Sequence, residues 1–260
     1  MISQIYPKNR MDFLTYRNIC EDILSMGDLR ERIIQEFLIR PFIASVVNYD
    51  VIPTDIKVSN RNNIHNYEKY SGKSSTSGEK TVTPDLCIAK KWEWANGEKD
   101  TRDYKATIEV KSPKKSVLSC YDTARNKMYN NIMNFEKNFG NSFLQKMRKI
   151  DIKIKDENST VTKTLYSEML SHLQVMNHVI LTDGIGWHFF EKENGILKIS
   201  SICLAMRKVD SKGNITLEWD ENKKRITKVF ENNFIVEKDI KFQELIKKIN
   251  NFVSDEEKNI

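Results

Sequence analysis

The residues from Thr83 to Pro113 constrain the fold most, because their apolar and charged side chains separate by the parity of the residue number. Successive side chains of a strand point to opposite faces, so residues of one parity share a face. The pattern predicts two strands, 83–89 and 104–111, joined through Asn96-Gly97. The even positions are apolar and the odd positions carry charge: Leu86, Ile88, Ala106, Ile108 and Val110 against Asp85, Glu109 and Lys111.

The register of this hairpin decides whether the charges meet. A three-residue turn centred on Gly97 places Asp85 opposite Glu109, with Lys111 one step along the same face. A two-residue turn would instead put Asp85 on the core face. In the first register two carboxylates and one ammonium converge, and two close carboxylates ionise together only with a cation to offset them. An edge hairpin with an ordinary surface ion pair is the alternative.

The chemistry of this trio suits metal-assisted cleavage of a phosphodiester. Mg²⁺ takes oxygen ligands, usually one or two carboxylates with waters and a substrate phosphate. A neighbouring lysine can act on the attacking water and on the charge of the transition state. The trio therefore predicts a magnesium-dependent hydrolase.

The motif also resembles a known family. Pro84-Asp85 followed by Glu109-Val110-Lys111 resembles the PD-(D/E)xK nuclease superfamily, and within it the nuclease domain of type I restriction enzyme motor subunits and related restriction endonucleases. Residues 32–38 before Pro41-Phe42 are similar to the family's opening helix, and residues 179–184 with Trp187 to its later strand-turn-strand. The family pattern Gln-x-x-x-Tyr ends at Tyr129, although Arg125 stands in the place of the glutamine.

The resemblance implies an endonuclease that cleaves DNA in restriction or in defence against foreign DNA, with Mg²⁺ as cofactor and Mn²⁺ able to replace it. Asp85 and Glu109 are the expected metal ligands, the backbone carbonyl of Val110 is a third, and Lys111 completes the catalytic set. The opening helix would add an acidic residue, Glu36 or else Glu31, unless these are surface charges. The expected nucleic-acid contacts are Lys114, Lys115, Arg125 and Tyr129.

The hydrophobic periodicity predicts an α/β fold in a single domain, residues 1–260. We expect a mixed central sheet flanked by helices near 28–45 and 116–139, with a restriction-endonuclease-like core over about 28–190. Residues 140–174 are expected to form a helical insertion, and residues 195–253 a β-rich extension with a closing helix. A helix over 11–25 ends at Gly27, Asp28 caps the next helix, and the apolar stripe of that helix is Leu29, Ile33, Ile34, Phe37 and Leu38.

Composition limits the class of protein. The chain has 260 residues, 39% of them hydrophobic, enough for one sizeable core. It contains no apolar run of about 18 residues and its first 13 residues do not read as a signal peptide, so a cytoplasmic protein is expected. The four cysteines and four histidines lack metal-ligand spacing. We therefore expect reduced, buried thiols and structural or surface histidines.

The net charge of +6 favours a polyanionic partner, most simply double-stranded DNA. A homodimer is expected because one such site cuts one strand at a time. No motor or methylase motif occurs in the sequence, so either activity would belong to a separate protein. The alternatives are a repair, recombination or RNA nuclease of the same fold and a nucleic-acid-binding module that does not cut.

Overall fold

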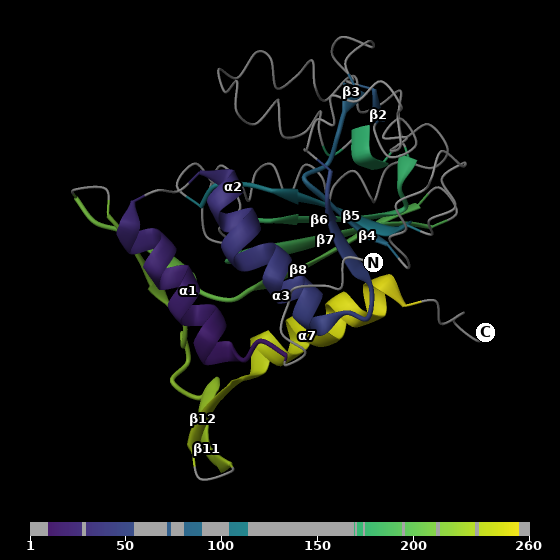
Figure 1. Ribbon diagram of the computed structural model, residues 1–260. Helices are drawn as coiled ribbons and strands as arrows, with labels where there is room; N and C mark the ends of the chain where they lie inside the picture. Colours follow the sequence, from purple (N-terminus) through teal and green to yellow (C-terminus); the bar gives the residue numbers. More distant parts are fainter. Residues whose placement is uncertain are drawn as a thin grey trace, which may run out of the picture.

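A mixed six-stranded sheet with helices against it forms the centre of the protein, for which we use a computed structural model (Figure 1). The strand order is β1-β4-β5-β6-β7-β8. The strands are β1 (Asp50–Pro53), β4 (Leu86–Ala89), β5 (Tyr104–Val110), β6 (His178–Thr182), β7 (Gly186–Glu193) and β8 (Ile196–Cys203). The structure describes residues 10–27, 30–54, 72–73, 81–89, 104–113, 169, 171–173, 175–193, 196–211, 214–231 and 234–254.

The antiparallel pair β4–β5 has the register that the sequence predicts. Leu86 pairs with Ile108 and Cys87 with Thr107, so that Asp85, just before β4, comes opposite Glu109. The register shifts at Ile88 and Ala89. The predicted turn at Asn96-Gly97 lies outside the described residues.

From Ala106 to Val110 both faces of β5 are buried, but by different kinds of residue. The even face is apolar there, and Ala106, Ile108 and Val110 have no exposed surface. On the odd face the polar Thr107 and Glu109 are also buried. This burial is the setting in which the charged trio has to be stabilised, because buried charges are costly without partners.

Helices α1 (Phe13–Met26) and α7 (Ile240–Val253) contribute to the same core as the even face. The side chain of Asp12 caps α1 through the N–H of Thr15. The helix ends at Gly27, as predicted, and Gly27 is in the left-handed conformation. Asp239 caps α7 through the N–H of Phe242 at 2.8 Å. In Figure 1 α7 runs along the sheet, and it contacts α3 (Arg40–Val46), β5 and β8.

The helix before β1 contains a wide turn that changes which side chains face the core. It consists of α2 (Glu31–Ile34), the π-helical turn η1 (Gln35–Ile39) and α3. The extra residue of a π turn rotates the following side chains around the axis, so Ile39 is buried and Phe37 is 62% exposed. The prediction that Phe37 belongs to the apolar stripe was wrong for this reason. The N-cap is Arg30, not Asp28.

Strands β5 and β6 are parallel, so the chain between them must cross over. The predicted helix 116–139 and most of the predicted insertion 140–174 lie outside the described residues. The end of the crossover is described: residues 169, 171–173 and 175 are helical and lead into β6. We call these five positions the crossover helix.

The remaining strands form three small antiparallel pairs. Strands β9 (Met206–Val209) and β10 (Ile215–Glu218) make one, and β11 (Ile226–Glu231) and β12 (Phe234–Asp239) make a hairpin that projects from the body in Figure 1. Strands β2 (Gly72–Lys73) and β3 (Thr81–Val82) make the third. Within the described ranges no helix is long and apolar enough to cross a membrane. In the same part of the chain Cys20, Cys87 and Cys203 are buried and form no disulfide.

Candidate metal and catalytic site

The structure brings the predicted trio together at the end of β5. Glu109 and Val110 are the last two residues of that strand, Lys111 follows, and Asp85 precedes the neighbouring strand β4. Two peptide hydrogen bonds hold this end of the sheet: Lys111 N–H donates to Thr182 O at 2.8 Å, and Thr54 N–H donates to Asp85 O at 3.0 Å. The trio is thus attached to β1 on one side and to β6 on the other.

Asp85 is oriented by the strand opposite. Its Oδ2 accepts the backbone N–H of Val110 at 2.7 Å. Thr54, just after β1, fixes the preceding peptide, because its hydroxyl donates to the carbonyl of Pro84. In a strand the N–H and C=O of one residue point to the same neighbour, so the carbonyl of Val110 also faces the Asp85 side. This is the arrangement expected if that carbonyl serves as a third oxygen ligand.

Glu109 has a partner on each carboxylate oxygen. The ammonium of Lys111 donates to Oε1, and Nε2 of His172 in the crossover helix lies 2.9 Å from Oε2. Glu109 is 5% exposed and His172 has no exposed surface, whereas the side chain of Lys111 keeps 18% exposure. Of the three groups, Lys111 is the one with access to solvent.

The pKa values of the two carboxylates move in opposite directions. Burial, with the charge of Glu109 adding to it, raises the pKa of Asp85 to about 8, against the Val110 hydrogen bond and the Lys111 charge. Burial also acts to raise the pKa of Glu109, but the hydrogen bond from His172 and the charge of Lys111 outweigh it, and the pKa is lowered. Such a split between neighbouring carboxylates is typical of functional sites.

The donor set fits a hard divalent cation of the magnesium type. Two carboxylates and one backbone carbonyl are oxygen donors, and Mg²⁺ keeps several waters beside one or two carboxylates. Among the described residues no group of three or more His, Cys, Asp and Glu side chains could hold a metal ion by itself.

The structure separates the two acidic residues of the opening helix. Glu36 is paired with Arg40 of the same helix at 2.9 Å and also accepts from the side chain of Gln35. The charge of Glu31 acts on Asp85 and helps to raise its pKa. Of the two candidates for a further acidic group, Glu31 is therefore the one that interacts with the trio.

His172 is the residue that the sequence did not single out. It was expected to be structural or at the surface, and no local pattern marks it, since 63 positions separate it from Glu109. A usable signal is topological, because a helix that leads into a parallel strand lies across one face of the sheet. The four predicted nucleic-acid contacts, Lys114, Lys115, Arg125 and Tyr129, lie outside the described residues.

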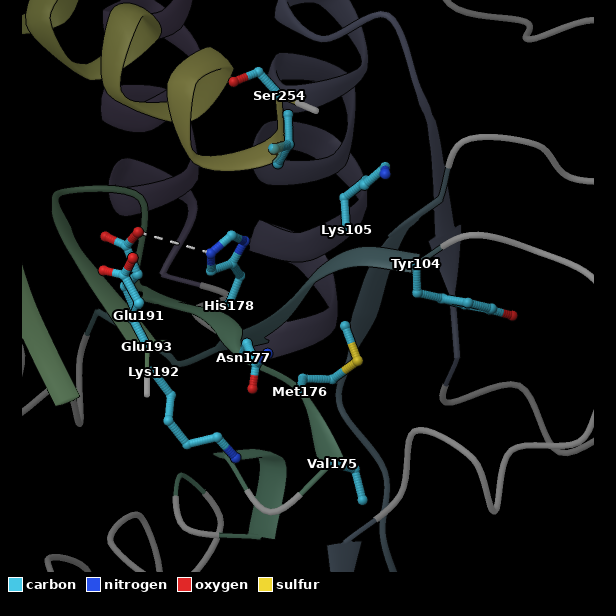
Figure 2. A pocket seen from close by; sticks show the side chains of 11 residues that line it. Tyr104, Lys105, Val175, Met176, Asn177, His178, Glu191, Lys192, Glu193 and Ser254 are labelled. Atoms are coloured by element: carbon cyan, nitrogen blue, oxygen red, sulfur yellow. Dashed lines mark ion pairs between the residues drawn. The ribbon is translucent and has the colours of Figure 1, made fainter. Parts of the chain in front are cut away.

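A pocket of about 580 Å³ lies at the opposite end of β5 from the trio, with Tyr104 and Lys105 in its wall (Figure 2). Its other walls are the start of β6, the end of β7 and the C-terminus of α7. The ammonium of Lys192 in this pocket donates a hydrogen bond to the carbonyl of Leu173. Burial lowers the pKa of Lys192. The pocket thus touches the crossover helix but none of the trio.

Comparisons with protein-family models, curated protein sequences and solved structures gave no match for this chain. The class that the structure defines is mixed α/β, with a central six-stranded sheet flanked by helices.

Proposed function

We propose that this protein is a magnesium-dependent endonuclease of the restriction-endonuclease-like type, acting on DNA in restriction or defence. The observation that carries the proposal is the register of β4 and β5, which sets Asp85 opposite Glu109 with Lys111 bound to Glu109. The spacing of these residues resembles that of the PD-(D/E)xK nucleases.

Each residue has a role that its surroundings suit. Asp85, Glu109 and the carbonyl of Val110 would hold Mg²⁺, which when bound supplies a Lewis acid and makes a coordinated water more acidic. Lys111 donates hydrogen bonds next to the metal ligands, where it can orient the attacking water and offset charge on the phosphate. The N–H of Val110 and the ring of His172 hold the two carboxylates, and Thr54 fixes the backbone at Pro84 and Asp85.

A nucleic-acid-binding module that does not cut would have little need of this arrangement. Burying the charge of Glu109 and holding Asp85 at a raised pKa both lower the stability of the fold. Apolar or neutral residues at these positions would let the protein bind DNA without that loss of stability.

Two copies of the chain would be needed for the simplest double-strand break. We therefore include a homodimer in the proposal.

The test compares cleavage and metal binding in one set of variants. Purified protein is incubated with Mg²⁺ and plasmid DNA, linear duplex, single strands, branched DNA or RNA, and metal binding is measured by calorimetry with Mn²⁺. Asp85→Ala and Glu109→Ala should lose metal binding and cleavage together. Lys111→Ala should keep metal and lose cleavage about 100-fold or more, the scale of a lost acid-base or charge-stabilising group.

The matched control is Lys105→Ala, because Lys105 lies on the same strand but in the pocket at the other end. This variant should cut at the wild-type rate. Cleavage by Lys111→Ala at the wild-type rate, or a wild-type protein that cuts none of the substrates with any divalent cation, would refute the proposal. The substrate that is cut fastest assigns the type of nucleic acid.

A further inference from the structure

His172 is a wholly buried histidine whose ring makes one polar contact with the part of the chain that the structure describes. Its Nε2 lies 2.9 Å from Oε2 of Glu109. Its Nδ1 is buried and has no hydrogen-bond partner among the described residues. An ionised carboxylate only accepts hydrogen bonds, so Nε2 carries the hydrogen and His172 is the donor.

A buried histidine with one unpaired ring nitrogen stabilises the core less than an apolar residue would. A buried polar atom without a partner lowers the stability of the fold, and a leucine of similar size would avoid that loss. Within the described residues, the polar contact of its ring is with Glu109, a proposed metal ligand. The contact therefore explains the histidine better than packing does.

The two partners of Glu109, His172 and Lys111, differ in how firmly the surrounding structure holds them. The crossover helix is held at its end by Lys192, whose ammonium donates to Leu173 O and whose N–H donates to Asn177 O at 2.8 Å. Figure 2 shows Lys192, Met176 and Asn177 around this end of the helix. Lys111, in contrast, is partly exposed and sits on a flexible side chain.

We infer that His172 is a positioning residue that keeps Oε2 of Glu109 occupied, so that Glu109 offers a divalent cation the oxygen that Lys111 holds. With that oxygen ligating a cation, the ammonium of Lys111 would be released to bind water and phosphate. The inference rests on the proposed function. It adds His172 to the site and specifies that the cation replaces Lys111, and not His172, as a partner of Glu109. Partners of ligating carboxylates of this kind typically change metal affinity by about 10–100-fold.

The first test measures Mn²⁺ affinity by calorimetry without DNA. His172→Leu should bind Mn²⁺ about tenfold or more weakly, whereas His172→Gln, whose amide nitrogen can reach the place of Nε2, should recover most of that loss. The matched control is His188→Leu. His188 is also buried, lies in the same row of the sheet two strands from Glu109, and contacts Ser201 at 2.8 Å. Removing it should leave Mn²⁺ affinity unchanged.

The second test uses the wild-type fold, so it does not depend on a variant that folds. The imidazole Nε2–H signal of His172 in ¹⁵N NMR spectra should exchange slowly and persist when Mg²⁺ is added. A signal that disappears with Mg²⁺ would show that the cation takes Oε2.

The outcomes separate this inference from the proposed function. If wild type binds Mn²⁺ and cuts DNA while His172→Leu does both equally well, or if Leu and Gln are equally weak, the inference alone is overturned. If wild type neither binds a divalent cation nor cuts, the proposed function fails and the role of His172 fails with it.

Discussion

The backbone N–H of Val110 donates to Oδ2 of Asp85 at 2.7 Å, so the first carboxylate of the candidate site is bonded to the strand that carries the second. This bond cannot form if the hairpin slips by one residue, because a slip moves every side chain to the other face. The register of β4 and β5 therefore determines which residues form the site.

The metal-free protein should lose stability as the pH rises. Folded Asp85 keeps its proton up to a pH of about 8, whereas in the unfolded chain it loses it near 4. The folded state therefore binds more protons in this window, and the free energy of unfolding falls with rising pH, by at most about 1.4 kcal/mol per pH unit. Urea denaturation in a chelator at pH 5–8 measures it.

The control for that experiment is Asp85→Asn, which should remove this pH dependence. Glu109 does not interfere, because its pKa is lowered and its stabilisation is lost only when the pH falls below the ordinary glutamate range. An equal slope in wild type and Asp85→Asn would assign the proton to another group.

The two acidic residues of the opening helix should behave differently when neutralised. Glu31→Gln removes a charge that raises the pKa of Asp85, so Asp85 should titrate at a lower pH. Glu36→Gln is the matched variant, because Glu36 is paired with Arg40. It should leave the titration of Asp85 unchanged. Carboxyl ¹³C chemical shifts against pH report both, and the opposite order would place Glu36 beside the site.

Gly184 in the turn after β6 should resist substitution. Its φ is +84°, and an added Cβ would lie 2.7 Å from Cδ2 of the buried Leu38. Gly184→Ala should therefore cost about 2–4 kcal/mol from backbone strain and crowding together. Gly27→Ala separates the two causes, since Gly27 has φ +70° and open space around it. It should cost about 1–2 kcal/mol. Equal losses in chemical denaturation would exclude a steric contribution.

Affinity for duplex DNA should fall with salt, as expected for a chain of net charge +6 on a polyanion. The logarithm of the binding constant should decrease with the logarithm of salt by about 0.9 for each phosphate contacted. Fluorescence anisotropy in Ca²⁺, at several salt concentrations, gives the slope. A constant affinity between low and physiological salt would exclude electrostatic docking.

The sequence predicted the hairpin of the site better than its surroundings. The parity of Asp85 and Glu109 and the closely spaced strands are local features, so the register followed from periodicity. His172 and Thr54 reach the site through the crossover and through β1, and no short-range pattern carries such contacts. Phe37 was misplaced because a π turn leaves no clear trace in the apolar spacing.

The parallel pairing of β5 and β6 has a consequence for the order in which the protein folds. Strands β4 and β5 are neighbours in the chain, so Asp85 and Glu109 can meet early at little loss of chain entropy. His172 is 63 positions from Glu109, so their contact forms only when the crossover between β5 and β6 has closed. Contacts between residues far apart in sequence form slowly during folding. During synthesis and refolding we expect the two carboxylates to come together before the donor that orients one of them, so the candidate site is completed last.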